Sequence, residues 1–173
     1  GSFHSLKNLD LLLDAIALLN EENGNINYKI LHIGKFPEKY SKVRFLEQTG
    51  YLEDCEFKSA IRRMRIGLLN WSFDEKFRTI AQTSLPLKIH NYLSFSIPVL
   101  SLGPPNSSID KFVIENQCGT SCTINDPYIL SASIKKLSNS KNIQKYKFGI
   151  QNAYKKYSRK KFFKEFERFI NLN

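Results

Sequence analysis

The residues best suited to chemistry lie between Thr83 and Asn91, where polar caps, a proline and a lysine follow one another closely. Pro86 suits the first turn of a helix, where its missing N–H costs nothing, and Thr83 and Ser84 can cap the free amides. The positive end of the helix dipole attracts anions, and Lys88 adds a full charge one turn in. This spacing predicts a phosphate-binding turn. The alternative for Lys88 is a solvated lysine on a helix surface.

A phosphate-binding turn needs a sheet to position it, and the surrounding sequence predicts one. The run 98–103 is short and apolar, and glycine and two prolines close it, which is typical of a buried parallel strand. Along the rest of the chain, periodicity predicts helices over 9–19, 54–64, from Pro86, 108–116 and 127–137, and strands over 28–33, 43–45, 66–71 and 118–124. Residues 72–84 are predicted to form a polar loop, and Ser107 with Asp110 resembles a capping box for helix 108–116.

This alternation predicts an α/β domain with a Rossmann-like parallel sheet and helices on both faces. A chain of 173 residues with 42% hydrophobic residues is suited to one such domain. We expect the domain to span residues 1–158, with its first strand falling before residue 1 if the sheet is complete. Residues 159–173 are expected to form a separate C-terminal helix.

Several segments together resemble the C-terminal half of GT-B glycosyltransferases of the large family 4 type. Residues 84–103 are similar to the donor-site segment of these enzymes, and residues 1–12 to their glycine loop with a basic residue downstream. The segments 28–34, 43–52 and 66–71 resemble the family's next strands in the same order. The resemblance covers essentially the whole chain.

The resemblance implies a domain that binds a nucleoside diphosphate sugar, whose sugar is transferred to an acceptor hydroxyl in the synthesis of bacterial polysaccharide or glycoconjugate. It implies an acceptor-binding N-terminal domain as partner, so we expect this chain alone to bind donor without turnover. Fixed amides and lysines would stabilise the leaving diphosphate, with no metal or other cofactor. The donor-binding residues implied are Gly1, Ser2, Lys7, Gly34, Thr83, Ser84, Lys88 and Asn91.

Three positions depart from the family's pattern. Asn91 and Thr83 stand where the family commonly has glutamates that meet the ribose and the donor sugar, and Ser2 stands where arginine is frequent. Asparagine still exchanges hydrogen bonds with hydroxyl groups but lacks the charge of a carboxylate. Two other functions therefore remain open, a noncatalytic Rossmann-like binding module and a GT-B-shaped nucleotide-sugar epimerase.

Positive charge is concentrated toward the end of the chain. Of a net charge of +10, residues 141–173 carry +8, from ten lysines and arginines against Glu165 and Glu167. In residues 159–173 phenylalanines and basic residues fall on opposite faces of a helix. Such a helix can pack on the domain, lie on an anionic membrane surface or contact nucleic acid. We expect the apolar face to pack and the excess charge to attract a membrane, with no nucleic-acid partner.

The remaining composition bears on cellular location and on metal binding. No apolar run approaches the roughly 20 residues that a membrane span needs, and no signal peptide is visible. We expect a cytoplasmic protein, peripheral to the inner face of the plasma membrane. Cys55, Cys118 and Cys122 lack the spacing of metal knuckles or redox pairs, and no histidine joins them at metal spacing. The sequence therefore predicts reduced thiols and no bound metal.

Overall fold

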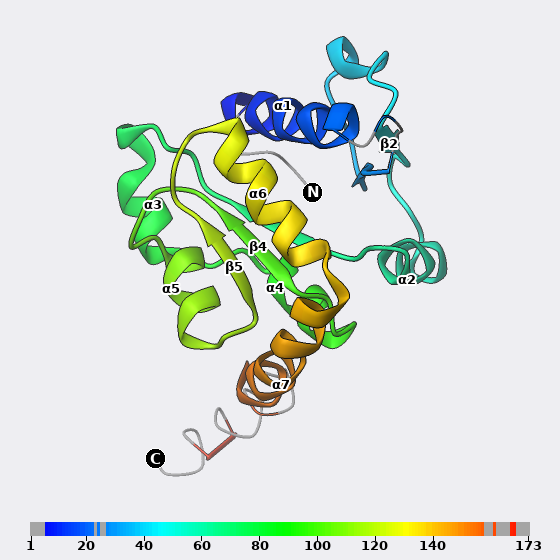
Figure 1. Cartoon of the computed structure of the whole chain (residues 1–173). Helices are drawn as coiled ribbons and strands as arrows, with labels where there is room; N and C mark the ends of the chain where they lie inside the picture. The colour runs from blue at the N-terminus through cyan, green and yellow to red at the C-terminus, as the bar shows by residue number, and fades with distance from the viewer. Residues whose placement is uncertain (1–5, 23, 25–26, 158–160, 162–166, 169–173) are drawn as a thin grey trace.

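A computed structural model describes residues 6–22, 24, 27–157, 161 and 167–168, in which helices alternate with strands (Figure 1). The helices are α1 (Leu6–Glu22), α2 (Asp54–Arg62), α3 (Arg78–Thr83), α4 (Lys88–Ser94), α5 (Ser108–Glu115), α6 (Pro127–Ser138) and α7 (Ser140–Tyr157), and the 3-10 turns are η1 (Glu38–Tyr40) and η2 (Glu75–Phe77). The strands are β1 (Ile30–His32), β2 (Leu46–Gln48), β3 (Gly67–Asn70), β4 (Val99–Leu102) and β5 (Gly119–Cys122). The predicted α/β class is confirmed.

The described strands form two parallel sheets. β1 pairs with β2, with Ile30 opposite Leu46. β4 lies between β3 and β5, and Val99 is opposite both Gly67 and Gly119. The parallel direction agrees with the prediction, but the strands belong to two small sheets and not to one. Figure 1 shows β2 and α2 on one side of β4, and α3 and α5 on the other.

Helices cover both faces of the three-stranded sheet, as the sequence predicts. Successive residues of a strand point to opposite faces. The ring of Tyr92 in α4 fills the space that a Cβ on Gly67 would occupy, so Gly67 is the residue type that allows α4 to approach β3. The next side chain, Leu68, lines a cavity together with Leu12 and Ile16 of α1. α4 and α1 therefore lie on opposite faces of β3.

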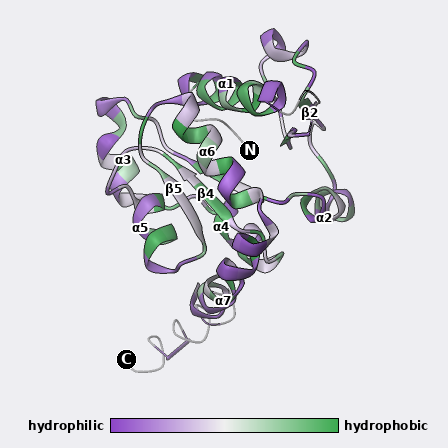
Figure 2. Cartoon of the chain, viewed as in Figure 1, coloured by the Kyte–Doolittle hydropathy of each residue, from purple (hydrophilic) through white to green (hydrophobic). Residues whose placement is uncertain are grey.

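The core is built mainly from α1, α6 and the three-stranded sheet. Leu12, Ile16 and Leu19 recur at helical spacing on α1 and are buried, and α1 packs against α6. Figure 2 shows the contrast with α7, whose visible surface is largely hydrophilic. The helix predicted over 9–19 is confirmed, and it extends in both directions to Leu6 and Glu22.

Three local predictions are wrong in their boundaries. Residues 72–84, predicted to be loop, contain η2 and α3. The strand predicted over 43–45 lies at Leu46–Gln48, because the Leu46 N–H donates to the Val43 carbonyl and makes residues 43–45 a turn. The helix predicted from Pro86 begins at Lys88, since the preceding residues form turns in which the Ile89 N–H donates to Pro86.

The cap predicted for α5 is present. The Ser107 hydroxyl accepts a hydrogen bond from the Asp110 N–H, and Asp110 reaches back to the Asn106 N–H at 2.8 Å. α7 was not predicted and is the longest helix among the described residues. Gly149 lets it approach the chain after α5, because a Cβ there would collide with the carbonyl of Gln117.

Candidate functional site

The carboxyl ends of β1 and β3 converge on Lys88, the first residue of α4. Its Nζ donates to Oδ1 of Asn70, the last residue of β3, at 3.5 Å. Burial lowers the pKa of His32, the last residue of β1, and the nearby charge of Lys88 lowers it further. Ligands of open α/β sheets bind outside the carboxyl ends of the strands. These three side chains therefore mark the edge where a ligand is expected.

Lys88 and Asn70 are both short of partners. Burial lowers the pKa of the Lys88 ammonium to about 8, and none of the ion pairs between described residues includes it. Asn70 is 1% exposed, and its Nδ2 has no hydrogen-bond partner within the described part of the chain. A buried donor left unsatisfied costs about 1–3 kcal/mol. An anion or polar ligand at this edge would satisfy both groups.

A cavity of 1160 Å³ opens at this edge and continues between the two sheets. His32, Lys88 and Asn91 line it at the carboxyl ends of the strands. Its middle is apolar, with walls from α1, α2, α6, β1, β3 and β4 that include Leu12, Leu68 and other aliphatic residues. Of the cationic residues that line the cavity, Lys88 is the one at the carboxyl ends of β1 and β3, whereas Lys29 and Arg65 line it before these strands and Arg63 lines it after α2.

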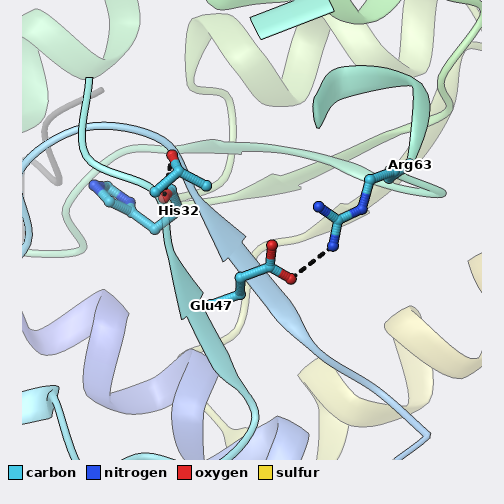
Figure 3. A network of polar contacts seen from close by, with 4 residues as sticks. His32, Glu47 and Arg63 are labelled. Atoms are coloured by element: carbon cyan, nitrogen blue, oxygen red, sulfur yellow. Dashed lines mark hydrogen bonds and ion pairs between the residues drawn. The ribbon is translucent and has the colours of Figure 1, made fainter. Parts of the chain in front are cut away.

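A second cationic group borders the cavity but already has a partner. Arg63, which follows α2, donates from Nη2 to Oε2 of Glu47 in β2 at 2.7 Å, and both side chains are more than 40% exposed. Figure 3 shows this pair facing one another while the ring of His32 points away from it. An exposed ion pair of this kind contributes about 0–1 kcal/mol. Lys88 is therefore the better anion ligand of the two.

The structure brings together only part of the predicted donor site. Lys88 and Asn91 line the same cavity. Thr83 ends α3, and its hydroxyl donates to the Thr79 carbonyl. No side chain of the described residues makes a capping hydrogen bond at the start of α4. The Ser84 carbonyl accepts from Trp71 Nε1 at 3.1 Å. The prediction that Thr83 and Ser84 cap the phosphate-binding helix is wrong. The amides that an anion would have used bond to the turn before α4, which leaves Lys88 as the main attraction.

The other predicted residues lie elsewhere. Lys7 is exposed on α1. Its charge contributes to lowering the pKa of Asp74, which is lowered chiefly by the hydrogen bond from the Lys76 N–H. Gly34 forms an isolated bridge with Gly50 beyond the ends of β1 and β2. Gly1 and Ser2 lie outside the described residues. So does most of the C-terminal helix predicted over 159–173, of which only three residues are described.

His32 and Asn70 were not identified from the sequence. Each is the next-to-last residue of a segment that the sequence does predict to be a strand, and parallel strands present their carboxyl ends at one edge. Applied to the last two residues of every predicted strand, that rule would have included both His32 and Asn70. His90, the other histidine near the site, is exposed on α4.

No protein family and no curated protein matches this chain. Among the described residues, no helix combines the length and the apolar character needed to cross a membrane.

Proposed function

We propose that the chain is the donor-binding domain of a GT-B glycosyltransferase and that it holds the diphosphate of a nucleotide sugar at the edge formed by Lys88, Asn70 and His32. The observation that carries this proposal is Lys88, a desolvated ammonium without an ion-pair partner among the described residues, placed where the carboxyl ends of two parallel sheets converge. A diphosphate supplies the missing negative charge. Its oxygens also accept from the unsatisfied Nδ2 of Asn70.

In this proposal the site acts by electrostatics. The leaving diphosphate gains negative charge as the bond to the sugar breaks, so an ammonium fixed beside it lowers the barrier. Lys88 binds the diphosphate as a cation, and ligand charge raises its pKa back toward the ordinary range. Asn91 lines the same cavity and lies on the same helix, and in this proposal its side chain bonds ribose hydroxyls. The acceptor and its general base belong to a partner domain.

One observation favours a second candidate, a binding module without transferase activity. Thr83 stands where the family's sugar-contacting glutamate is expected, and its hydroxyl is bonded to the Thr79 carbonyl at 2.9 Å. The cavity does not include it. A domain of this kind would bind the nucleoside diphosphate and leave the sugar without that contact.

Titration calorimetry with UDP, GDP, CDP and ADP, each compared with its nucleoside, tests the proposal. We expect the parent to prefer one diphosphate over its nucleoside by about 1.5–3 kcal/mol, the size of a charge-assisted hydrogen bond. Lys88→Ala should remove most of this preference, and Lys88→Arg should keep part of it, since the charge survives. Lys111→Ala, an exposed lysine on α5, is the matched control and should bind as the parent does.

Circular dichroism of each variant verifies that the fold persists. If Lys88→Ala binds the diphosphate as tightly as Lys111→Ala does, the phosphate role of Lys88 is wrong. If the parent binds none of the four diphosphates, the donor-binding function is wrong as a whole.

A further inference from the structure

An open groove lies between α6 and β5, at one edge of the three-stranded sheet. β5 is last in the order β3, β4, β5, and no strand of the described part of the chain lies on its outer side (Figure 1). The groove has a volume of 460 Å³ and is formed by two residues of β5 and five of α6, which are Thr120, Ser121, Tyr128, Ile129, Ala132, Ser133 and Lys136. An uncovered strand edge of this kind can pair with a strand of another chain.

The backbone of β5 directs hydrogen-bonding groups to this outer side. The carbonyls of Cys118 and Cys122 accept from backbone N–H groups on the β4 side. Because the direction alternates along a strand, Ser121 presents its N–H and carbonyl to the outer side. Such groups are satisfied by an extended chain that adds a strand to the sheet. Residues 119–124 contain no lysine or proline, the residues that commonly prevent edge strands from pairing.

The α6 wall of the groove is complementary to a reversed copy of itself. Tyr128, Ala132 and Lys136 are four residues apart, so they follow one another along one side of the helix. The small residue is at the centre, with an aromatic ring on one side of it and an ammonium on the other. Tyr128 is 69% exposed, and Lys136 is exposed too. In an antiparallel pair of α6 helices that meet at Ala132, each ammonium faces the aromatic ring of the other copy, which favours a cation–π contact.

A two-fold axis at this edge satisfies the strand and the helix together. α6 begins at Pro127, after the short connection 123–126, and packs against β5, so it runs back along one face of the sheet. Antiparallel pairing of β5 with β5 of a second copy therefore places both α6 helices on the same face, running in opposite directions. Ser121 and Ala132 line the same groove, so one axis can pass by both residues. Packed helices lie about 8–10 Å apart, a distance that the small side chain of Ala132 allows.

We propose that the chain forms a homodimer in which β5 pairs antiparallel with β5 of a second copy and the two α6 helices pack around Ala132. Ser121 exchanges its backbone hydrogen bonds with Ser121 of the other copy, and each Lys136 lies over the Tyr128 ring of the other. An unrelated peptide would satisfy the strand edge but not the reversed match along α6. Residues 141–173, which carry +8 of the net charge of +10, do not line the groove. This inference does not depend on the proposed nucleotide.

Sedimentation velocity of the chain, from low micromolar to submillimolar concentration, tests the proposal. We expect the parent to convert from monomer to dimer over this range. Ala132→Glu and Ala132→Lys each place like charges opposite one another at the two-fold axis, so each variant alone should dimerise about tenfold more weakly or less still. An equal mixture of the two should dimerise again, since opposite charges then meet. Ser59→Glu and Ser59→Lys, at an exposed residue of α2 outside the groove, are the matched controls and should dimerise as the parent does.

Hydrogen exchange of the parent measures the strand pairing independently of any variant. The Ser121 amide gains an acceptor in the dimer and should exchange about tenfold more slowly at the highest than at the lowest protein concentration, as for one added hydrogen bond. The Thr120 amide, directed to β4, is the internal control and should change little. A parent that stays monomeric over the whole range would overturn the proposal. So would a dimer that Ala132→Glu leaves intact, a mixture of the two Ala132 variants that stays monomeric, or a dimer in which the exchange of Ser121 is unchanged.

Discussion

Two buried polar regions lie at the carboxyl ends of the strands, one around Asp110 and one around Lys88, and they differ in how completely their groups are paired. The Asp110 carboxylate accepts from the Asn106 N–H at 2.8 Å and from the Ser121 hydroxyl at 2.6 Å. Ser121 in turn accepts from Ser101 at 2.8 Å, which connects β4, β5 and α5. The Asp110 carboxylate and the two serine hydroxyls therefore all have hydrogen-bond partners within the domain.

The Lys88 region is the opposite case. The Lys88 ammonium donates to Asn70 Oδ1 at the 3.5 Å limit, and the amide nitrogen of Asn70 has no partner in the described part of the chain. A folded protein rarely leaves buried polar groups unpaired without a reason in its function. The comparison teaches that a polar cluster at a sheet edge indicates a binding site when it is incomplete, and a structural role when it is complete.

Asp110→Ala is expected to have the largest effect. It tests the Asp110 region, whose polar groups are paired within the fold. It leaves the Asn106 N–H and the Ser121 hydroxyl without their acceptor, and we expect the free energy of unfolding to fall by about 2–4 kcal/mol. Asp110→Asn keeps one acceptor oxygen and should lose less. Urea denaturation measures both. Diphosphate affinity per folded molecule should match the parent; a selective loss of that affinity would mean that Asp110 belongs to the site.

The pH dependence of the Lys88 region is the next effect in size. Because the folded pKa, about 8, lies below the ordinary value of 10.5, the unfolded chain binds more protons between these values and stability should rise with pH in that window. Diphosphate affinity should instead fall, by up to about tenfold per pH unit above 8, as the ammonium deprotonates. Lys88→Met should show neither slope. Thermal unfolding from pH 7 to 10 measures the stability, and calorimetry over the same range measures the diphosphate affinity. If Lys88→Met shows the same two slopes as the parent, groups other than Lys88 cause them.

Much of the fold could be predicted from local signals. The leucines of α1 recur at helical spacing, β3 and β4 are short apolar runs, and Ser107 with Asp110 marks the start of α5. α7 was also predictable, since its buried residues Tyr146, Gly149, Ile150 and Ala153 recur at helical spacing within a lysine-rich background. These features depend on residues close together in the chain.

The sequence-based predictions that failed concern features that depend on contacts between segments distant in the chain. Nothing local to the segments of β1 and β3 shows that they belong to separate sheets. The start of α4 depends on turns before it, and Ser84 is engaged by Trp71, 13 residues earlier. Lys88 was found because a motif surrounds it, whereas His32 and Asn70 become part of a site only when two strand ends converge on it.

Substitution of Asn91 is expected to have the smallest effect of the three. It tests whether the incompletely paired region around Lys88 extends to this residue. It lines the cavity three residues after Lys88, on the same helix. If it bonds a ribose hydroxyl, Asn91→Leu should weaken diphosphate binding by about 1 kcal/mol, the net value of one hydrogen bond. Asn91→Glu, the residue that the family pattern has here, should keep or tighten binding through a charged acceptor. His90→Leu, the exposed neighbour on α4, is the control, and calorimetry with the nucleoside alone separates ribose from phosphate. Should Asn91→Leu and His90→Leu bind equally well, the ribose contact would lie elsewhere, and the site would be limited to the phosphate groups at Lys88 and Asn70.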